Sequence, residues 1–346
     1  MKLPNELLLQ IISFLTNSDP KSLLNLSWTC TRFHQLLNHF NSYYKKAAIK
    51  ENSNILIVCK NNNLISLLLL FKYNLLDFIN TTDHLNQNCF HKIAKLNHLN
   101  QFNYISSKLS LNQLKIKINE IDLLGITPLQ IAIENNHLKM SHLLLNYNAN
   151  INIQSKTGQT SLISAIKNNN FNMVKLLLSL GANINLKLMT GESPIFMAIE
   201  KNNYQITKLL LESGSDIQDT IRNGWTLIHF AIQIGNYEIC KLLISKQISL
   251  NQTDSFGLTP LHVAIQQNNY QIVELLLKTD KSTMNSQTLS GLTPLMISCI
   301  NGNYQICELL LKYNANPNIC HNGMNCFDQV KSRNFLKIQK LFESIN

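Results

Sequence analysis

The chain has 346 residues, of which 45% are hydrophobic and 14% are charged, and its formal net charge is +10. The hydrophobic fraction is sufficient for a packed protein, although a repetitive chain would share one elongated core and would not divide into ordinary domains. Eight irregularly spaced cysteines argue against a disulfide scaffold and favour a reducing compartment.

The positive charge is spread along the chain, and no basic run alternates with aromatic residues. This pattern favours a generally basic surface over a nucleic-acid or anionic-membrane site, neither of which we expect. The longest apolar run, Leu67–Phe71, is much shorter than the ~20 residues of a membrane helix. The abundant asparagine permits two interpretations, prion-like aggregation or biased composition. Its place in turns favours the second.

Residues 3–46 predict three short helices. Pro4 and Glu6 suit the first turn of a helix, and the following residues are apolar on more than one face. Pro4, Glu6 and Gln10 also interrupt what would otherwise resemble a signal peptide. Three helices of this length cannot bury so much apolar surface alone, so either the rest of the chain or another protein covers them.

The order of these residues resembles an F-box. The positions that fit the family pattern are Leu3, Pro4, Glu6, Leu7, Ile11, Phe14, Leu15, Asp19, Leu23, Leu26, Cys30, Arg32, Phe33 and Leu36. The resemblance implies that this motif docks onto the Skp adaptor of cullin–RING ubiquitin ligases. The implied adaptor-binding residues are Leu3, Pro4, Glu6, Leu7, Ile11, Phe14, Leu15, Leu23, Leu26 and Phe33. Tyr43 and Tyr44 stand where many members have tryptophan. The alternative is a helical N-terminal cap for the segments that follow.

Residues 47–120 predict two degenerate helix–turn–helix units. The first spans a turn at Lys60–Asn63, and the second contains Asn88–His91. Six extra residues separate this second unit from the regular pattern, and we place them between Leu109 and Glu120.

Residues 121–321 repeat with a period near 33. A glycine followed two residues later by Thr or Ser recurs at Gly125, Gly158, Gly191, Gly224, Gly257 and Gly291, and a leucine-rich triplet follows each one. This pattern resembles the ankyrin repeat. The predicted fold is therefore all-α: an ankyrin solenoid of helix pairs with short β-turn fingers, preceded by a small three-helix F-box. Residues 322–346 lack the Thr-Pro-Leu tripeptide and predict a C-terminal capping repeat.

Position within the repeat predicts structural roles for residues that could otherwise be taken for catalytic or metal-binding residues. A Thr or Ser caps each first helix, proline often follows, and Asn or Gly ends the helix in a left-handed conformation. His229 and His262 occupy the family's Thr-Pro-Leu-His position, which implies loop-tying rather than catalytic histidines. Cys240 and Cys307 occupy a valine position and predict buried side chains. Cys320, His321 and Cys326 form too loose a cluster to predict zinc.

No phosphate loop, metalloprotease or serine-hydrolase motif is present, so we predict a binding protein that is not an enzyme and needs no cofactor or metal. The candidate target-binding residues lie on the repeat fingertips and on the first helices, which line the palm: Met189, Arg222, Trp225, Phe256, Leu258, Leu289, Met197 and Phe230. Trp225, Arg222 and Phe256 form the preferred patch. Alternatively, these tips pack on each other and stabilise the array.

Together the two resemblances imply a substrate-recognition subunit of an SCF-type cullin–RING ligase. It would bind a Skp-type adaptor and an unknown target protein in the cytoplasm, with the nucleus also possible. The alternatives are a plain ankyrin scaffold and an effector that an intracellular pathogen delivers into host cytoplasm.

Overall fold

The computed structural model describes residues 79–344. The predicted F-box helices of residues 3–46 and the first degenerate unit lie outside this range. The chain divides after Ser110 into two compact units, which we describe separately. Every regular element in the described range is a helix, and the extended backbone there is limited to two isolated bridges, Thr220–Thr226 and His321–Met324.

The described part of the first unit contains one helix pair, α6 (Cys89–Leu96) and α7 (Leu99–Lys108). Asn88 starts α6 because its Oδ1 accepts a hydrogen bond from the His91 amide at 3.1 Å. Phe90 and Phe102 join the helices through an edge-to-face contact, with ring centroids 5.5 Å apart. The predicted second degenerate unit is therefore a helical hairpin.

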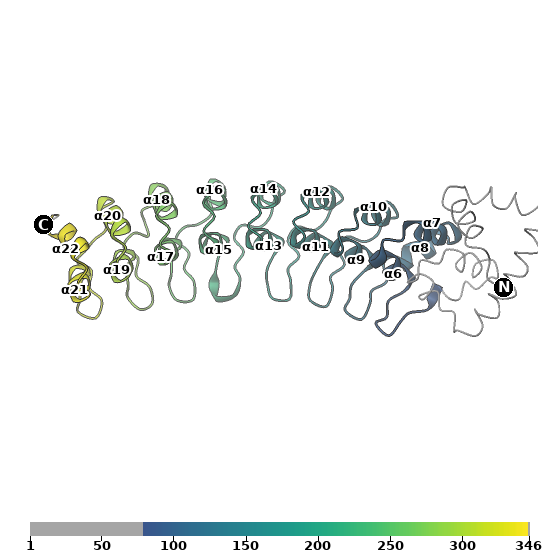
Figure 1. Cartoon of the computed structure of the whole chain (residues 1–346), viewed down its shortest axis with the longest axis horizontal. Coiled ribbons are helices and arrows are strands. Elements are labelled where there is room, and N and C mark those ends of the chain that lie inside the picture. The colour runs from purple at the N-terminus through teal and green to yellow at the C-terminus, as the bar shows by residue number, and fades with distance from the viewer. Residues whose placement is uncertain (1–78, 345–346) are drawn as a thin grey trace, which may run out of the picture. The chain divides into compact units, whose positions relative to one another are not determined.

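The second unit begins with α8 (Leu111–Lys117), which lies where the six extra residues were expected. Seven helix pairs follow (Figure 1). The first helices of the pairs, which we call the inner helices, are α9 (Pro128–Glu134), α11 (Ser161–Lys167), α13 (Pro194–Glu200), α15 (Leu227–Ile234), α17 (Pro260–Gln266), α19 (Pro294–Ile300) and α21 (Cys326–Ser332). The second, outer helices are α10 (Leu138–Asn146), α12 (Phe171–Ser179), α14 (Tyr204–Glu212), α16 (Tyr237–Ser245), α18 (Tyr270–Thr279), α20 (Tyr304–Lys312) and α22 (Leu336–Glu343).

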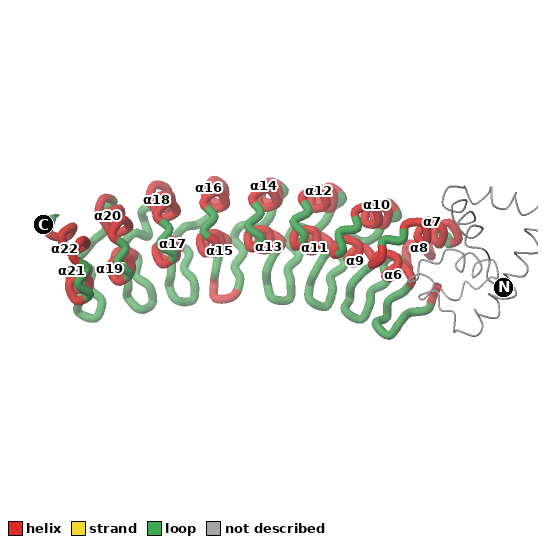
Figure 2. Tube along the Cα trace, in the orientation of Figure 1, coloured by secondary structure: helices red, strands yellow, loops and turns green. Residues whose placement is uncertain are grey.

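The inner helices form one row and the outer helices a second, and the long loops project on the side of the inner row (Figure 2). Each helix contacts its own pair partner, each inner helix contacts the next inner helix, and from α12 onwards each outer helix contacts the next outer helix. The core lies between the rows, and six of the seven inner helices, α9 to α19, have a fully buried small residue in the middle. These residues are Ala132, Ala165, Ala198, Ala231, Ala264 and Ser298. A larger side chain there would separate neighbouring helices, because interiors are packed without spare volume.

The predicted caps begin the inner helices. Thr127 Oγ1 accepts a hydrogen bond from the Gln130 amide, and Thr160, Thr259 and Thr293 make the equivalent bond. Ser193 differs, since its buried Oγ has no hydrogen-bond partner within the part of the chain that the structure describes. Proline follows the cap in four of these helices, where its missing N–H leaves no bond unmade.

Asparagine has two structural roles, only one of which the sequence predicted. Asn136, Asn169, Asn202 and Asn268 follow inner helices with φ between 53° and 57°, the left-handed region that Asn tolerates. Asparagine side chains also connect repeats. The Asn170 amide donates to Asn136 Oδ1 at 2.9 Å, and Asn152 Oδ1 accepts from the backbone N–H of Asn183 at 2.8 Å. We call these contacts the asparagine links.

The loops between helix pairs form fingers, each closed by a tight turn. In one finger Asp254 Oδ1 accepts hydrogen bonds from the amides of Phe256 and Leu258, both at 2.8 Å. Neighbouring fingertips are joined by single backbone bonds, such as Leu289 N–H to Phe256 O at 3.0 Å. The fingers are therefore ordered and hold their tip residues in fixed positions. Within the described range, no helix has both the length and the apolar character that a membrane crossing requires.

Candidate functional site

Three of the predicted fingertip residues are exposed. Met189, Phe256 and Leu289 expose 78%, 62% and 80% of their surface, although all three are large and apolar. They lie on different fingers, one or two residues before a repeat glycine. The fingertips of Phe256 and Leu289 are joined by a backbone hydrogen bond, and exposed apolar groups that lie together commonly mark interaction sites. The side chain of Arg222 lies outside the described part of the structure.

Trp225 is half-buried and is held by the next finger. Its Nε1–H donates a hydrogen bond to Asp254 Oδ2 at 3.2 Å, and its ring contacts that of Phe230 with centroids 6.5 Å apart. Asp254 also closes the finger that carries Phe256. Trp225 therefore stabilises neighbouring fingers although it is partly exposed, so the alternative of tips packing on each other applies to this residue.

The predicted palm residues differ in how much surface they present. Met197 is 7% exposed, and Val263, at the equivalent position of α17, is 2% exposed, so both belong to the core. Phe230 is half-buried, between the rings of Phe196 and Trp225. The structure thus brings Trp225, Phe230 and Leu258 to the surface of the inner row but leaves little of Met197 available to a partner.

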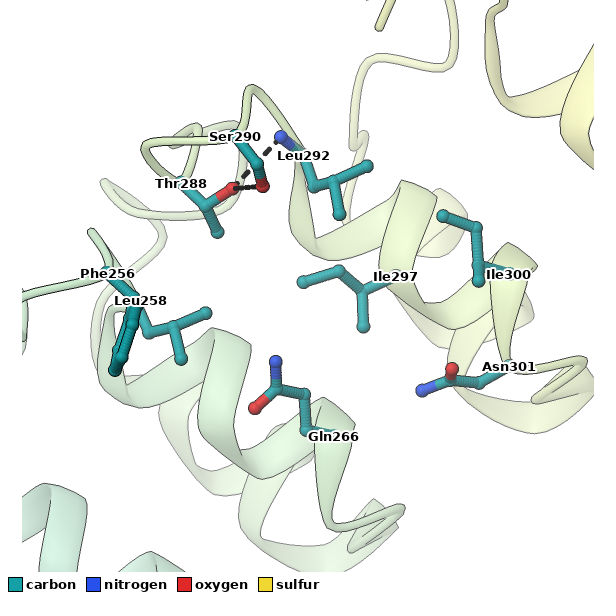
Figure 3. Close-up of a pocket in the computed structure, with 9 residues that line it drawn as sticks. All are labelled: Phe256, Leu258, Gln266, Thr288, Ser290, Leu292, Ile297, Ile300 and Asn301. Atoms are coloured by element: carbon teal, nitrogen blue, oxygen red, sulfur yellow. Dashed lines mark hydrogen bonds between the residues drawn. The ribbon is translucent and has the colours of Figure 1, made fainter.

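A groove of about 370 Å³ lies between α17 and α19 (Figure 3). Nine residues line it: Phe256, Leu258, Gln266, Thr288, Ser290, Leu292, Ile297, Ile300 and Asn301. Phe256 and Leu258 belong to one finger, and Leu292, Ile297 and Ile300 line the groove from the next repeat. The walls are apolar, and the amides of Gln266 and Asn301 lie at one end of the groove.

Sequence reasoning named Phe256 and Leu258 but missed the opposite wall. Ile300 holds the last position of its inner helix, where sister repeats have Glu134, Lys167, Glu200, Gln233 and Gln266. An isoleucine in this otherwise polar, exposed position is the signal that would have found it. Leu292 gives no such signal, because apolar residues are common at the equivalent fingertip position.

Comparison with known families agrees with the geometry. The ankyrin-repeat model in three copies matches residues 90–188 and 195–286, and the single-repeat model matches residues 290–322. The chain belongs to the ankyrin-repeat family. An F-box-like model matches residues 1–49, which agrees with the second resemblance.

Among solved structures, the ankyrin array resembles the ankyrin repeat domain of Bcl-3, described as a unique member of the IκB protein family. The TM-score is 0.57 and the identity 24%, and the match covers 62% of this chain and 99% of that one. This likeness shows the shared fold. A comparison with curated protein sequences gave no match.

His229 and His262 hold neighbouring loops together through hydrogen bonds, as the family resemblance implied. The buried His262 ring accepts a hydrogen bond from the Thr259 N–H through Nδ1 at 3.1 Å, and its Nε2 contacts Ser286 O at 3.1 Å. His229 makes the equivalent bond to Leu258 O at 3.0 Å. Burial lowers the pKa of both rings, that of His262 to about 4, so both are neutral near pH 7.

The ankyrin cysteines are mostly core residues. Cys240 and Cys307 are fully buried, as predicted, whereas Cys320 is exposed and Cys326 is buried. Cys320 and Cys326 thus have different environments. Within residues 79–344 no group of three or more His, Cys, Asp or Glu side chains is placed to hold a metal ion.

We expect the exposed Cys320 to react with iodoacetamide at least about 10-fold faster than Cys240 at neutral pH. Thiolates are the reactive species, and burial both shields Cys240 and raises its pKa to about 12. The measurement is mass spectrometry of labelled peptides over a time course. A denatured sample, in which both thiols are accessible, is the control. Equal native rates would contradict the described packing.

Proposed function

We propose that this protein is the substrate-recognition subunit of an SCF-type cullin–RING ubiquitin ligase. The observation that carries the proposal is the combination, in one chain, of an F-box-like match over residues 1–49 and an ankyrin array. Both modules are interaction modules, and the combination supports an adaptor. In this proposal the F-box comprises residues 1–46, the regular repeats residues 121–321, and the cap residues 322–346.

The proposed mechanism is proximity, without chemistry performed by the chain itself. The F-box binds a Skp-type adaptor and thereby the ligase core, while the ankyrin surface binds a target protein. Simultaneous binding makes the encounter of target lysines with the charged ubiquitin enzyme effectively intramolecular, and the resulting effective concentration raises the transfer rate. The protein would act where the ligase components are present, in the cytoplasm.

The exposed side chains Met189, Phe256 and Leu289 favour a target-binding role for the array over a purely structural one. A scaffold that only presents the F-box would gain nothing from large apolar tips in water. An effector delivered by an intracellular pathogen would use the same biochemistry. It would differ only in the cell that supplies the ligase.

Replacing Leu3 and Pro4 together by alanine is expected to abolish co-purification with a Skp-type adaptor. Both residues lie in the matched segment, and the F-box resemblance assigns them to adaptor binding. The measurement is co-expression with the adaptor followed by affinity purification through the chain's C-terminus. Leu124→Ala, a single change at an exposed ankyrin fingertip, is the matched control and should retain the adaptor.

Circular dichroism of the double variant should show an intact array, because the ankyrin core lies in other residues. An adaptor that still co-purifies with the folded double variant would overturn the ligase proposal. The same segment would then be interpreted as an N-terminal cap.

A further inference from the structure

Three consecutive inner helices, α15, α17 and α19, carry no charged residue. Helices α15, α17 and α19 contain no Asp, Glu, Lys or Arg, whereas α9, α11 and α13 end with Glu134, Lys167 and Glu200. In a chain with a net charge of +10 this is a local departure from the general surface. We call the surface of these three helices the uncharged palm.

The groove between α17 and α19 is part of the uncharged palm. Figure 3 shows Leu258 and Phe256 on one side, with Leu292 and Ile297 opposite them. At the finger end, the hydroxyls of Thr288 and Ser290 share a hydrogen bond of 2.9 Å. At the other end, the exposed amides of Gln266 and Asn301 are available to a ligand.

We propose that this groove binds an uncharged segment of the target protein, which inserts one aliphatic or aromatic side chain between Leu258 and Leu292. The inference rests on the proposed function, since it names the partner chemistry of the array. A charged side chain in the groove would lose hydration without an opposite charge to replace it, which is strongly unfavourable. An apolar side chain gains free energy from the same burial.

The dimensions and the amides favour a peptide segment as the occupant. The volume of about 370 Å³ lies in the range of small-ligand pockets, which suits one large side chain with its neighbouring backbone. Gln266 and Asn301 each offer a donor and an acceptor, the complement of a peptide group. A second copy of this chain fits less well, because a stable interface uses about 20–30 residues on each side and nine line this groove.

The test uses the full chain to select linear random peptides from a phage library, followed by affinity measurement with the best peptide, acetylated and amidated. We expect the selected peptides to contain a Leu, Ile, Met or Phe flanked by uncharged residues. Phe256→Glu should weaken binding at least about 10-fold, because it places a charge in the groove. Leu124→Glu is the matched control. It is 60% exposed against 62% for Phe256, both directly precede a repeat glycine, and its affinity should stay within about twofold of wild type.

A second variant tests the opposite wall. Ile300→Gln gives the residue found in the same position at Gln233 and Gln266, so the fold tolerates it, and we expect peptide binding to fall about fivefold. The inference would be overturned if the library gave charged peptides or no enriched peptide at all. It would also be overturned if Leu124→Glu lost as much peptide affinity as Phe256→Glu. Concentration-dependent dimerisation that Phe256→Glu abolishes would overturn it too, because a second copy would then occupy the groove.

The inference and the proposed function fail separately. Phe256→Glu leaves the F-box untouched, so its co-purification with the Skp-type adaptor should equal that of the wild type. Loss of peptide binding with retained adaptor binding supports the groove. If the chain binds peptide but never binds the adaptor, the inference about the groove stands and only the ligase proposal fails.

Discussion

Gly257→Ala is expected to destabilise its repeat by about 3 kcal/mol. Gly257 has φ +75°, and a Cβ at this position would lie 2.7 Å from the backbone nitrogen of Leu289. The left-handed conformation alone costs an L-residue roughly 1–2 kcal/mol. The contact adds to this cost, because the atom in the way belongs to the backbone of the next finger and makes the fingertip hydrogen bond.

Gly181→Ala is the matched control. This glycine has φ +84°, but a Cβ there meets no atom within 4 Å, so only the conformational cost of about 1–2 kcal/mol remains. Urea unfolding compares the total stabilities, and amide hydrogen exchange at Leu289 locates the loss. Repeat arrays lose cooperativity easily, so the local measurement is the decisive one. Equal destabilisation by the two substitutions would show that neighbouring fingers do not approach as closely as described.

His262→Gln is expected to keep the fold and to remove part of its pH dependence. The folded-state pKa of His262 is about 4, whereas its ordinary value is 6.5. Between these values the unfolded chain takes up a proton that the folded chain does not, so stability is complete above about pH 6.5 and falls as the pH drops towards about 4. The contribution lost is about 3 kcal/mol, at about 1.4 kcal/mol per pH unit.

Glutamine is the suitable replacement because the array already contains it in this position. Gln130 Oε1 accepts a hydrogen bond from the Thr127 N–H at 2.8 Å, and its Nε2 donates to Ile153 O at 2.9 Å. Gln130 thus accepts from the cap residue and donates to the next loop, as His262 does, but it has no titrating group. Urea unfolding at several pH values measures the effect for both chains. If the wild type and His262→Gln lose stability equally between about pH 6.5 and about 4, His262 is not the titrating group.

The sequence predicted the architecture because ankyrin signals are local. A threonine cap, a following proline and a left-handed asparagine act within a few residues, so Thr127, Pro128 and Asn136 could each be interpreted from neighbours alone. The repeat period then placed these short elements side by side. A family match over the same residues confirms that interpretation.

The candidate site was predicted less completely, because it depends on contacts between repeats. Nothing near Trp225 in the sequence indicates that Asp254, 29 positions later, holds its indole. Met197 follows the same pattern as other palm residues, yet its neighbours cover it. Ile300 was missed because its importance depends on which finger faces it. The F-box residues remain predictions, since they lie outside the described range.

The asparagine links are contacts that slow hydrolysis of the side-chain amides would remove. Asparagine is a thermolabile residue whose amide can hydrolyse to a carboxylate. At Asn170 that change would remove the donor to Asn136 and place negative oxygen against oxygen between two repeats. The same would happen independently at Asn203, which donates to Asn169. Deamidation would therefore weaken the contacts between repeats at several places in the array. The cell would have to replace aged molecules by new synthesis to keep the protein folded.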